Sequence, residues 1–81
     1  MNRAQLAWRC RRGMRELDLL LADYLEQRYD HAALDERETF RRLLDASDDA
    51  LWRYFYQDLA PEGPALAALV RRIRDAAASH P

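Results

Sequence analysis

The chain passes from a basic segment into a leucine-rich one through Arg9-Cys10-Arg11-Arg12-Gly13-Met14-Arg15-Glu16-Leu17-Asp18-Leu19-Leu20-Leu21. Glycine adopts a positive φ at little cost, so Gly13 predicts the end of a short first helix and the turn into a second. Apolar residues then recur three or four positions apart, which indicates one buried helix face: Met14, Leu17, Leu20, Leu21, Tyr24 and Leu25. Glu16 falls in the first turn of the second helix, where a carboxylate complements the helix dipole.

The arginines around this turn exceed what the turn itself requires. A helix corner with solvated arginines is the simplest interpretation of the stretch. An ion pair between Arg12 and Glu16, four positions apart, would add only a few tenths of a kcal/mol, too little to explain the arrangement as stabilisation. We therefore interpret the surplus of cations against one short acid as a functional surface.

The whole pattern predicts an all-α fold, a compact bundle of five short helices in a single domain over residues 1–81. The predicted helices cover about 3–11, 14–29, 35–45, 48–59 and 64–77, and the tail from 78 to 81 is expected to be frayed. No segment has the two-residue alternation of a strand flanked by hairpin turns.

Several residues predict how individual helices begin and pack. Asp35 and Glu38 have the spacing of a capping box, and Ser47 is a second N-cap candidate. Pro64 suits the first position of the last helix. We expect Trp8 to anchor the first helix to the body of the protein.

Aromatic residues crowd the fourth helix. Leu51, Phe55 and Leu59 share one face, which we expect to be buried. The other aromatic residues cannot all join that face, so one or two must reach solvent: Trp52, Tyr54 and Tyr56. Core packing explains most of this pattern, and an aromatic contact patch is the functional alternative.

Charge is balanced overall but unevenly distributed. The net charge is −1, 33% of the residues are charged, and every cation is an arginine. Residues 1–15 carry arginines and no acid, whereas the charged residues between positions 45 and 62 are all acids except Arg53. This distribution predicts a positive and a negative end, which suits an oriented partner.

Composition also limits the function classes. Cys10 is the single cysteine, which excludes an internal disulfide and fits a reducing compartment. His31 and His80 lack the spacing of a metal site, and the two glycines form no phosphate-binding loop. No apolar run approaches the roughly 20 residues that span a bilayer, and no secretory leader is evident, so we expect a cytoplasmic protein with no membrane insertion. Nothing predicts catalysis, so we expect no catalytic residues, no metal and no enzyme activity.

Nucleic acid is a weaker candidate partner. The arginine cluster beside a helical corner is compatible with phosphate binding, but Asp18, Asp23 and Glu26 follow along the second helix. These carboxylates would repel phosphates along the length of a recognition helix. We therefore expect no nucleic-acid partner and keep this function as a third alternative.

The segment from Arg12 to Glu16 resembles the Arg-Gly-x-x-Glu signature of the SdhE-like succinate dehydrogenase assembly factors, also called flavinylation factors. The resemblance extends over nearly the whole chain through ordered landmarks: Trp8, Tyr29-Asp30, Phe40, Leu43-Leu44, Asp48-Asp49-x-Leu51, Pro61 and Leu69-Val70-x-x-Ile73-Arg74. The chain departs from the pattern near Gln57-Asp58, where many members have a glycine before the proline loop.

The resemblance implies a chaperone-like factor with this five-helix architecture. It implies binding to the flavoprotein subunit of succinate dehydrogenase or fumarate reductase and promotion of covalent FAD attachment to a histidine of that subunit. FAD itself need not be bound stably by the factor, and we expect a monomer. The implied partner-binding residues are Arg12, Gly13 and Glu16, with Arg11 and Asp18 as weaker candidates. Related sequences have also been described as antitoxins against a small membrane toxin, which remains the alternative function.

Overall fold

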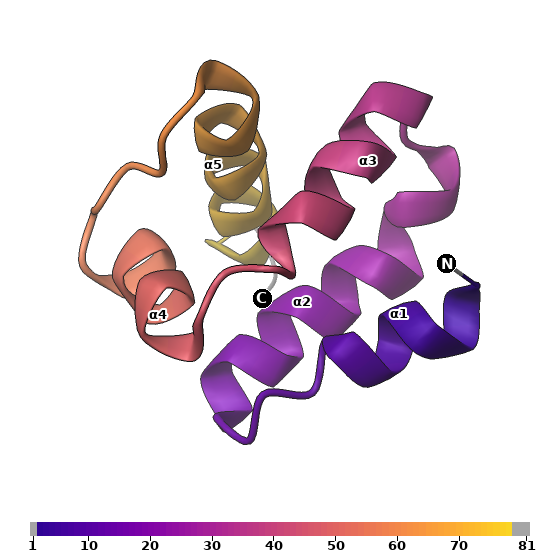
Figure 1. The fold of residues 1–81 in the computed structure, drawn as a ribbon, viewed down its shortest axis with the longest axis horizontal. Coiled ribbons are helices and arrows are strands. Elements are labelled where there is room, and N and C mark those ends of the chain that lie inside the picture. The colour runs from indigo at the N-terminus through magenta and orange to yellow at the C-terminus, as the bar shows by residue number, and fades with distance from the viewer. Residues whose placement is uncertain (1, 79–81) are drawn as a thin grey trace.

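The computed structural model describes residues 2–78 (Figure 1). Its elements are α1 (Arg3–Arg9), α2 (Arg15–Gln27), the 3₁₀ helix η1 (Tyr29–His31), α3 (Leu34–Leu43), α4 (Asp48–Tyr56) and α5 (Pro64–Ala78). Within this part of the chain there is no strand, so the predicted all-α bundle of five short helices is confirmed. Each of the first four helices ends two or three residues before its predicted end. The tail expected to be frayed covers residues 78–81. Ala78 belongs to α5, and residues 79–81 lie outside the described residues.

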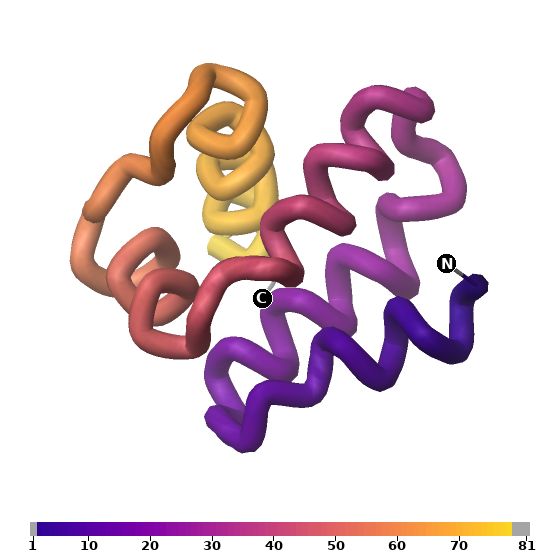
Figure 2. Tube along the Cα trace, viewed as in Figure 1, coloured from indigo at the N-terminus to yellow at the C-terminus, as the bar shows by residue number. Residues whose placement is uncertain are grey.

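Helices α2 and α5 hold the bundle together. Helix α2 contacts α1 on one side and α5 on the other, and α5 also contacts α3 and α4 (Figure 2). The predicted seam on α2 is confirmed, because Leu17, Leu21, Tyr24 and Leu25 are all buried. Each fully buried leucine contributes about 2 kcal/mol of hydrophobic stabilisation. Burial of this one face therefore fixes the orientation of α2, and with it the side that α2 turns to solvent.

A polar network ties α2, α3 and α5 together. The Tyr24 hydroxyl donates a hydrogen bond to Glu36 Oε2 at 2.6 Å, and Arg72 forms an ion pair with the other oxygen of the same carboxylate. The Tyr24 ring packs on Phe40 with a centroid separation of 4.6 Å. Burial, followed by the hydrogen bond to Glu36, raises the pKa of Tyr24 above its ordinary value. The proton therefore stays on the hydroxyl, where the network requires it.

The helix starts agree only in part with the sequence signals. The Ser47 side chain caps α4 by accepting a hydrogen bond from Ala50 N at 3.1 Å, and α5 begins at Pro64, as predicted. The prediction of a capping box formed by Asp35 and Glu38 is wrong. Helix α3 begins earlier, with Ala33 as an N-cap that has no side-chain hydrogen bond, so Asp35 already lies in the first turn. Its carboxylate accepts from the adjacent Glu36 N instead.

The loop between α4 and α5 contains Gln57-Asp58, where the chain departs from the pattern of the family that it resembles. Asp58 has a φ of +56°, the one non-glycine residue with a positive φ among the described residues. This left-handed conformation is easy for glycine and tolerated by aspartate. The Asp58 carboxylate also pairs with Arg74 at 2.7 Å. The chain therefore keeps a glycine-type turn here without the glycine.

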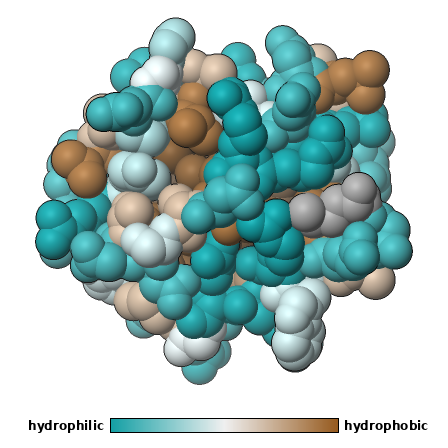
Figure 3. Space-filling model, viewed as in Figure 1, coloured by the Kyte–Doolittle hydropathy of each residue, from teal (hydrophilic) through white to brown (hydrophobic). Residues whose placement is uncertain are grey.

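Two apolar residues are placed differently from our expectation. The side chain of Trp8 is 72% exposed, so Trp8 does not anchor α1. Leu6 and Cys10 do so instead, because they share the face of α1 that turns toward α2. Leu59 is also exposed, because α4 ends at Tyr56 before the helical register reaches it. The face seen in Figure 3 is mainly hydrophilic, with apolar side chains in small separate areas.

Candidate functional site

Residues 10–14 connect α1 to α2, and we call residues 10–16, which add the first two residues of α2, the elbow. Gly13 has a φ of +82° and is exposed, as the sequence predicted. Met14 is the N-cap of α2 but supplies no side-chain hydrogen bond. Asp18 Oδ1 accepts a hydrogen bond from Arg12 N, two residues before this N-cap, at 2.5 Å. Asp18 thus holds the backbone of the elbow against the first turn of α2.

The Arg12 side chain points into the protein and not toward solvent. Its guanidinium donates from Nη1 to Ala46 O at 3.2 Å and from Nη2 to Leu44 O, and it pairs with Asp48 at 3.3 Å. Its side chain is only 16% exposed, and Nε is buried without a hydrogen-bond partner. Arg12 therefore ties the elbow to the connection between α3 and α4.

Cys10 is the buried first residue of the elbow. Its thiol is buried and free. Burial raises its pKa to about 11, and this effect outweighs the opposing influence of the nearby Arg12 guanidinium. The sulfur therefore stays protonated near neutral pH and packs as a small apolar group.

The outer side of the elbow is formed by Arg11, Gly13, Arg15 and Glu16, all of which are exposed. A Cβ at Gly13 would meet no other atom within 4 Å. Glycine at position 13 therefore permits the positive φ, and it leaves the space next to its backbone open on the outside of the protein. The Glu16 carboxylate makes no hydrogen bond or ion pair within residues 2–78, so it is available to an external cation.

Aromatic residues of α4 adjoin the start of α2. The Tyr56 hydroxyl lies 3.4 Å from Glu16 O, a long hydrogen bond, and its ring packs on Trp52 with centroids 4.5 Å apart. Tyr56 is 45% exposed, whereas Trp52 is half-buried. Burial, and then the charge of Glu16, raise the pKa of Tyr56. The exposed aromatic residue expected in α4 is therefore Tyr56, and it extends the surface of the elbow.

The predicted separation of charge into two ends is wrong. Arg9 pairs with Asp45 at 2.5 Å, and Arg12 with Asp48, so basic and acidic segments lie side by side. Arg3 pairs with Asp30 at 2.7 Å. This pairing lowers the positive charge that a phosphate backbone could meet, and it leaves Arg11 and Arg15 as the exposed cations of the elbow.

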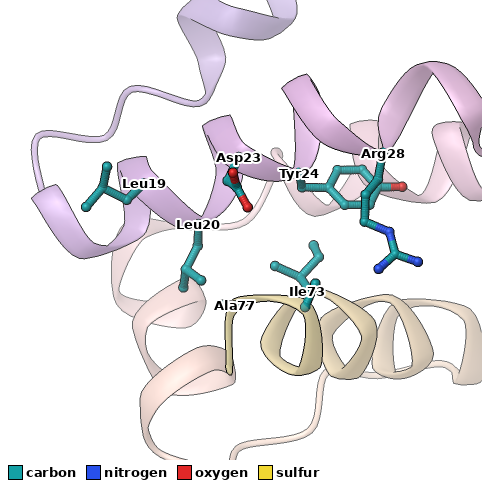
Figure 4. Close-up of a pocket in the computed structure, with 8 residues that line it drawn as sticks. Leu19, Leu20, Asp23, Tyr24, Arg28, Ile73 and Ala77 are labelled. Carbon is teal, nitrogen blue, oxygen red and sulfur yellow. The ribbon is translucent and has the colours of Figure 1, made fainter. Parts of the chain in front are cut away.

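An apolar groove lies between α2 and α5, with a volume of about 360 Å³. Figure 4 shows the residues that line it, which are Leu19, Leu20, Asp23 and Tyr24 of α2, Arg28 just after α2, and Ile73, Ala76 and Ala77 of α5. Residues 2–78 contain no group of three or more potential ligands that could hold a metal ion. None of the helices within that range combines the length and apolar character needed to cross a membrane.

The structure thus divides the predicted site residues into two sets. Gly13, Glu16 and Arg11 face outward, whereas Arg12 and Asp18 stabilise the elbow from within. Sequence reasoning missed Asp48 as a partner of Arg12, because no local pattern connects residues 36 positions apart. The arginines of residues 1–15 and the acids of residues 45–62 indicated that ion pairs between the two segments could form, but the sequence did not show which residues pair.

Comparison with known proteins gives matches along most of the chain. The model of a family described as "Flavinator of succinate dehydrogenase" matches residues 4–77. A protein of Methylococcus capsulatus named FAD assembly factor SdhE is 50% identical over 73 residues, which cover 90% of this chain and 88% of that protein. Proteins with the same name from Xylella fastidiosa and Haemophilus ducreyi are 46% and 35% identical over 70 and 74 residues. These alignments cover 86% and 91% of this chain, and 72% and 90% of the relatives.

Proposed function

Because the chain belongs to the family of succinate dehydrogenase flavinators, we propose that it binds the flavoprotein subunit of succinate dehydrogenase and promotes covalent attachment of FAD to it. As a member of this family, the protein is an assembly factor and not an enzyme. The flavoprotein subunit of fumarate reductase is a second proposed client. The free, buried thiol of Cys10 fits action in the reducing cytoplasm.

The observation that carries this proposal is the exposed elbow. Gly13 presents bare backbone with open space around it, and Glu16 presents a carboxylate without an internal partner. A partner can approach the backbone closely at Gly13 and place a cation against Glu16 in a charge-assisted hydrogen bond. Arg12 and Asp18 act as positioning residues, because they hold the elbow in this shape.

We propose that the elbow inserts between domains of the flavoprotein subunit. Binding there favours the domain arrangement in which a histidine of that subunit meets the flavin in reactive geometry. The chain itself supplies no reacting group in this scheme, and FAD is held by the partner. The chain promotes flavinylation because it binds the productive domain arrangement of the flavoprotein subunit more tightly than the unproductive one.

The test compares covalent flavin on the flavoprotein subunit in cells with and without this gene. After denaturing gel electrophoresis, covalently bound FAD fluoresces in the subunit band. We expect the band to lose most of its fluorescence on deletion and to regain it when the gene is restored. Unchanged fluorescence in the deletion strain would contradict the proposed function.

Substitution of Glu16 tests the outer side of the elbow. We expect Glu16→Ala to weaken binding to the flavoprotein subunit about tenfold, equivalent to about 1.4 kcal/mol, because one charge-assisted bond is lost. The melting temperature should change little, because the carboxylate has no internal partner among the described residues. Affinity is measured by titration calorimetry and stability by thermal unfolding.

Glu26→Ala is the matched control, since Glu26 is an exposed acid on the same helix but distant from the elbow. It should leave the affinity within about twofold. A large fall in the melting temperature of Glu16→Ala would instead assign Glu16 a role in stabilising the fold.

A further inference from the structure

The groove between α2 and α5 continues the surface of the elbow. Glu16, Leu20 and Asp23 follow one another on α2 at intervals of four and three residues, which places them along one side of the helix. With a rise of 1.5 Å per residue, the groove begins about 6 Å from Glu16. A partner segment that meets Glu16 therefore lies over the mouth of the groove.

The lining of the groove is suited to an apolar side chain. Ile73 and the half-buried Leu20 form its floor, and Figure 4 shows both side chains between the two helices. The small side chains of Ala76 and Ala77 leave the space open on the α5 side. Leu19 stands at the rim and is 60% exposed, so its side chain is open to contact from outside.

The polar groups at this groove do not converge on a ligand. The Tyr24 hydroxyl is already bonded to Glu36, and Asp23 has an interaction within the chain. The Arg28 guanidinium lies at the end of the groove opposite Leu19, away from the elbow (Figure 4). A small polar molecule or cofactor would therefore find few hydrogen-bond partners, whereas a volume of about 360 Å³ accommodates one or two large apolar side chains.

We infer that this groove is a second contact for the flavoprotein subunit, and that it takes an apolar side chain next to the basic residue that meets Glu16. This inference rests on the proposed function. The charge of Glu16 selects a basic residue of the partner. Because Glu16 and Leu20 are about one helical turn apart on α2, the partner's apolar side chain lies about that distance from its basic residue. The apolar side chain buried in the groove supplies affinity, and the ion pair at the elbow supplies orientation.

The test fills the groove without altering the elbow. We expect Ala77→Trp to weaken binding of the purified chain to the flavoprotein subunit at least tenfold, with helical circular dichroism retained. Ala65→Trp is the matched control, because Ala65 is exposed near the start of the same helix α5 and does not line this groove. It should change the affinity less than twofold. Equal weakening by both tryptophans would overturn the inference.

A second variant tests the groove contact even if Ala77→Trp fails to fold. Leu19→Gln changes an exposed rim residue, so the fold should tolerate it, and we expect about threefold weaker binding. Full affinity in this variant would overturn the inference.

Further results separate the groove from the proposed function. If the wild-type chain binds and Glu16→Ala weakens binding, but Ala77→Trp and Leu19→Gln bind normally, only the groove contact is wrong. If the wild-type chain does not bind the subunit, the proposed function is wrong as well. A second copy of the chain is a competing occupant. A dimer of the wild-type chain that Ala77→Trp converts to a monomer, detected by light scattering, would overturn the inference in favour of self-association.

Discussion

We expect the Gly13→Arg variant to fold and yet to leave the flavoprotein subunit without covalent FAD. A Cβ at this position would meet no atom of the protein within 4 Å, so the arginine side chain can extend into solvent. The φ of +82° costs an L-residue about 1–2 kcal/mol, which a domain with about 5–15 kcal/mol of stability survives. The new side chain fills the space where the partner approaches the backbone. Flavin fluorescence of the subunit in a complemented deletion strain measures the outcome.

Gly63→Arg provides a matched control for this variant. Gly63 has a φ of +94°, and a Cβ there also meets nothing within 4 Å, so the backbone penalty is similar. Gly63 precedes α5 and does not belong to the elbow. Flavinylation should therefore persist with Gly63→Arg. Persistent flavinylation with Gly13→Arg would contradict insertion of the elbow between domains of the partner.

The second large effect is expected from Arg12→Met, and it concerns stability. This substitution keeps most of the side-chain length but removes the bonds to the carbonyl oxygens of Leu44 and Ala46 and the pair with Asp48. Hydrogen bonds from a charged donor are worth about 1.5–3 kcal/mol each when buried, and Asp48 is partly solvated, so we expect a loss of about 2–3 kcal/mol in total. For a domain of this size, the melting temperature should fall by about 10–20 °C.

The control for Arg12→Met is Arg11→Met. Arg11 is the adjacent arginine and is exposed, so its loss should change the free energy of unfolding by less than about 0.5 kcal/mol. Urea unfolding of both variants gives the comparison. If Arg12→Met retained the wild-type stability but no longer bound the flavoprotein subunit, Arg12 would contact the partner directly, as the family signature suggests.

The course of the helices was largely predictable from the sequence. The spacing of Leu17, Leu21 and Leu25 identified the buried face of α2, and the family resemblance carried by Arg12, Gly13 and Glu16 is confirmed by relatives along most of the chain. These features depend on a helical period or on a short ordered motif, both of which are visible in a linear sequence.

Two failures concern where single residues lie on their helices. Asp35 has the spacing of a capping residue, but α3 already begins at Leu34 after the N-cap Ala33, so Asp35 lies inside the helix. Trp8 is large and apolar, yet Leu6 and Cys10 are the residues of this segment that are buried, so the tryptophan faces solvent. In the case of Trp8, smaller residues fill the inward positions, and its size alone could not reveal this.

The sequence by itself determined the helical fold, the positive φ at Gly13 and the membership of the family, because each depends on residues close together in the chain or on their order. Only the tertiary structure decided which charges of the elbow face inward. Arg12 is stabilised by Leu44, Ala46 and Asp48, and these acceptors reach it only because α3 and α4 fold back over the start of α2. Among residues 2–78, no acceptor pairs with the Arg11 guanidinium and no donor with the Glu16 carboxylate, and both side chains remain at the surface. The physical reason is that a buried charge needs partners brought together from distant segments, and packing alone selects those partners.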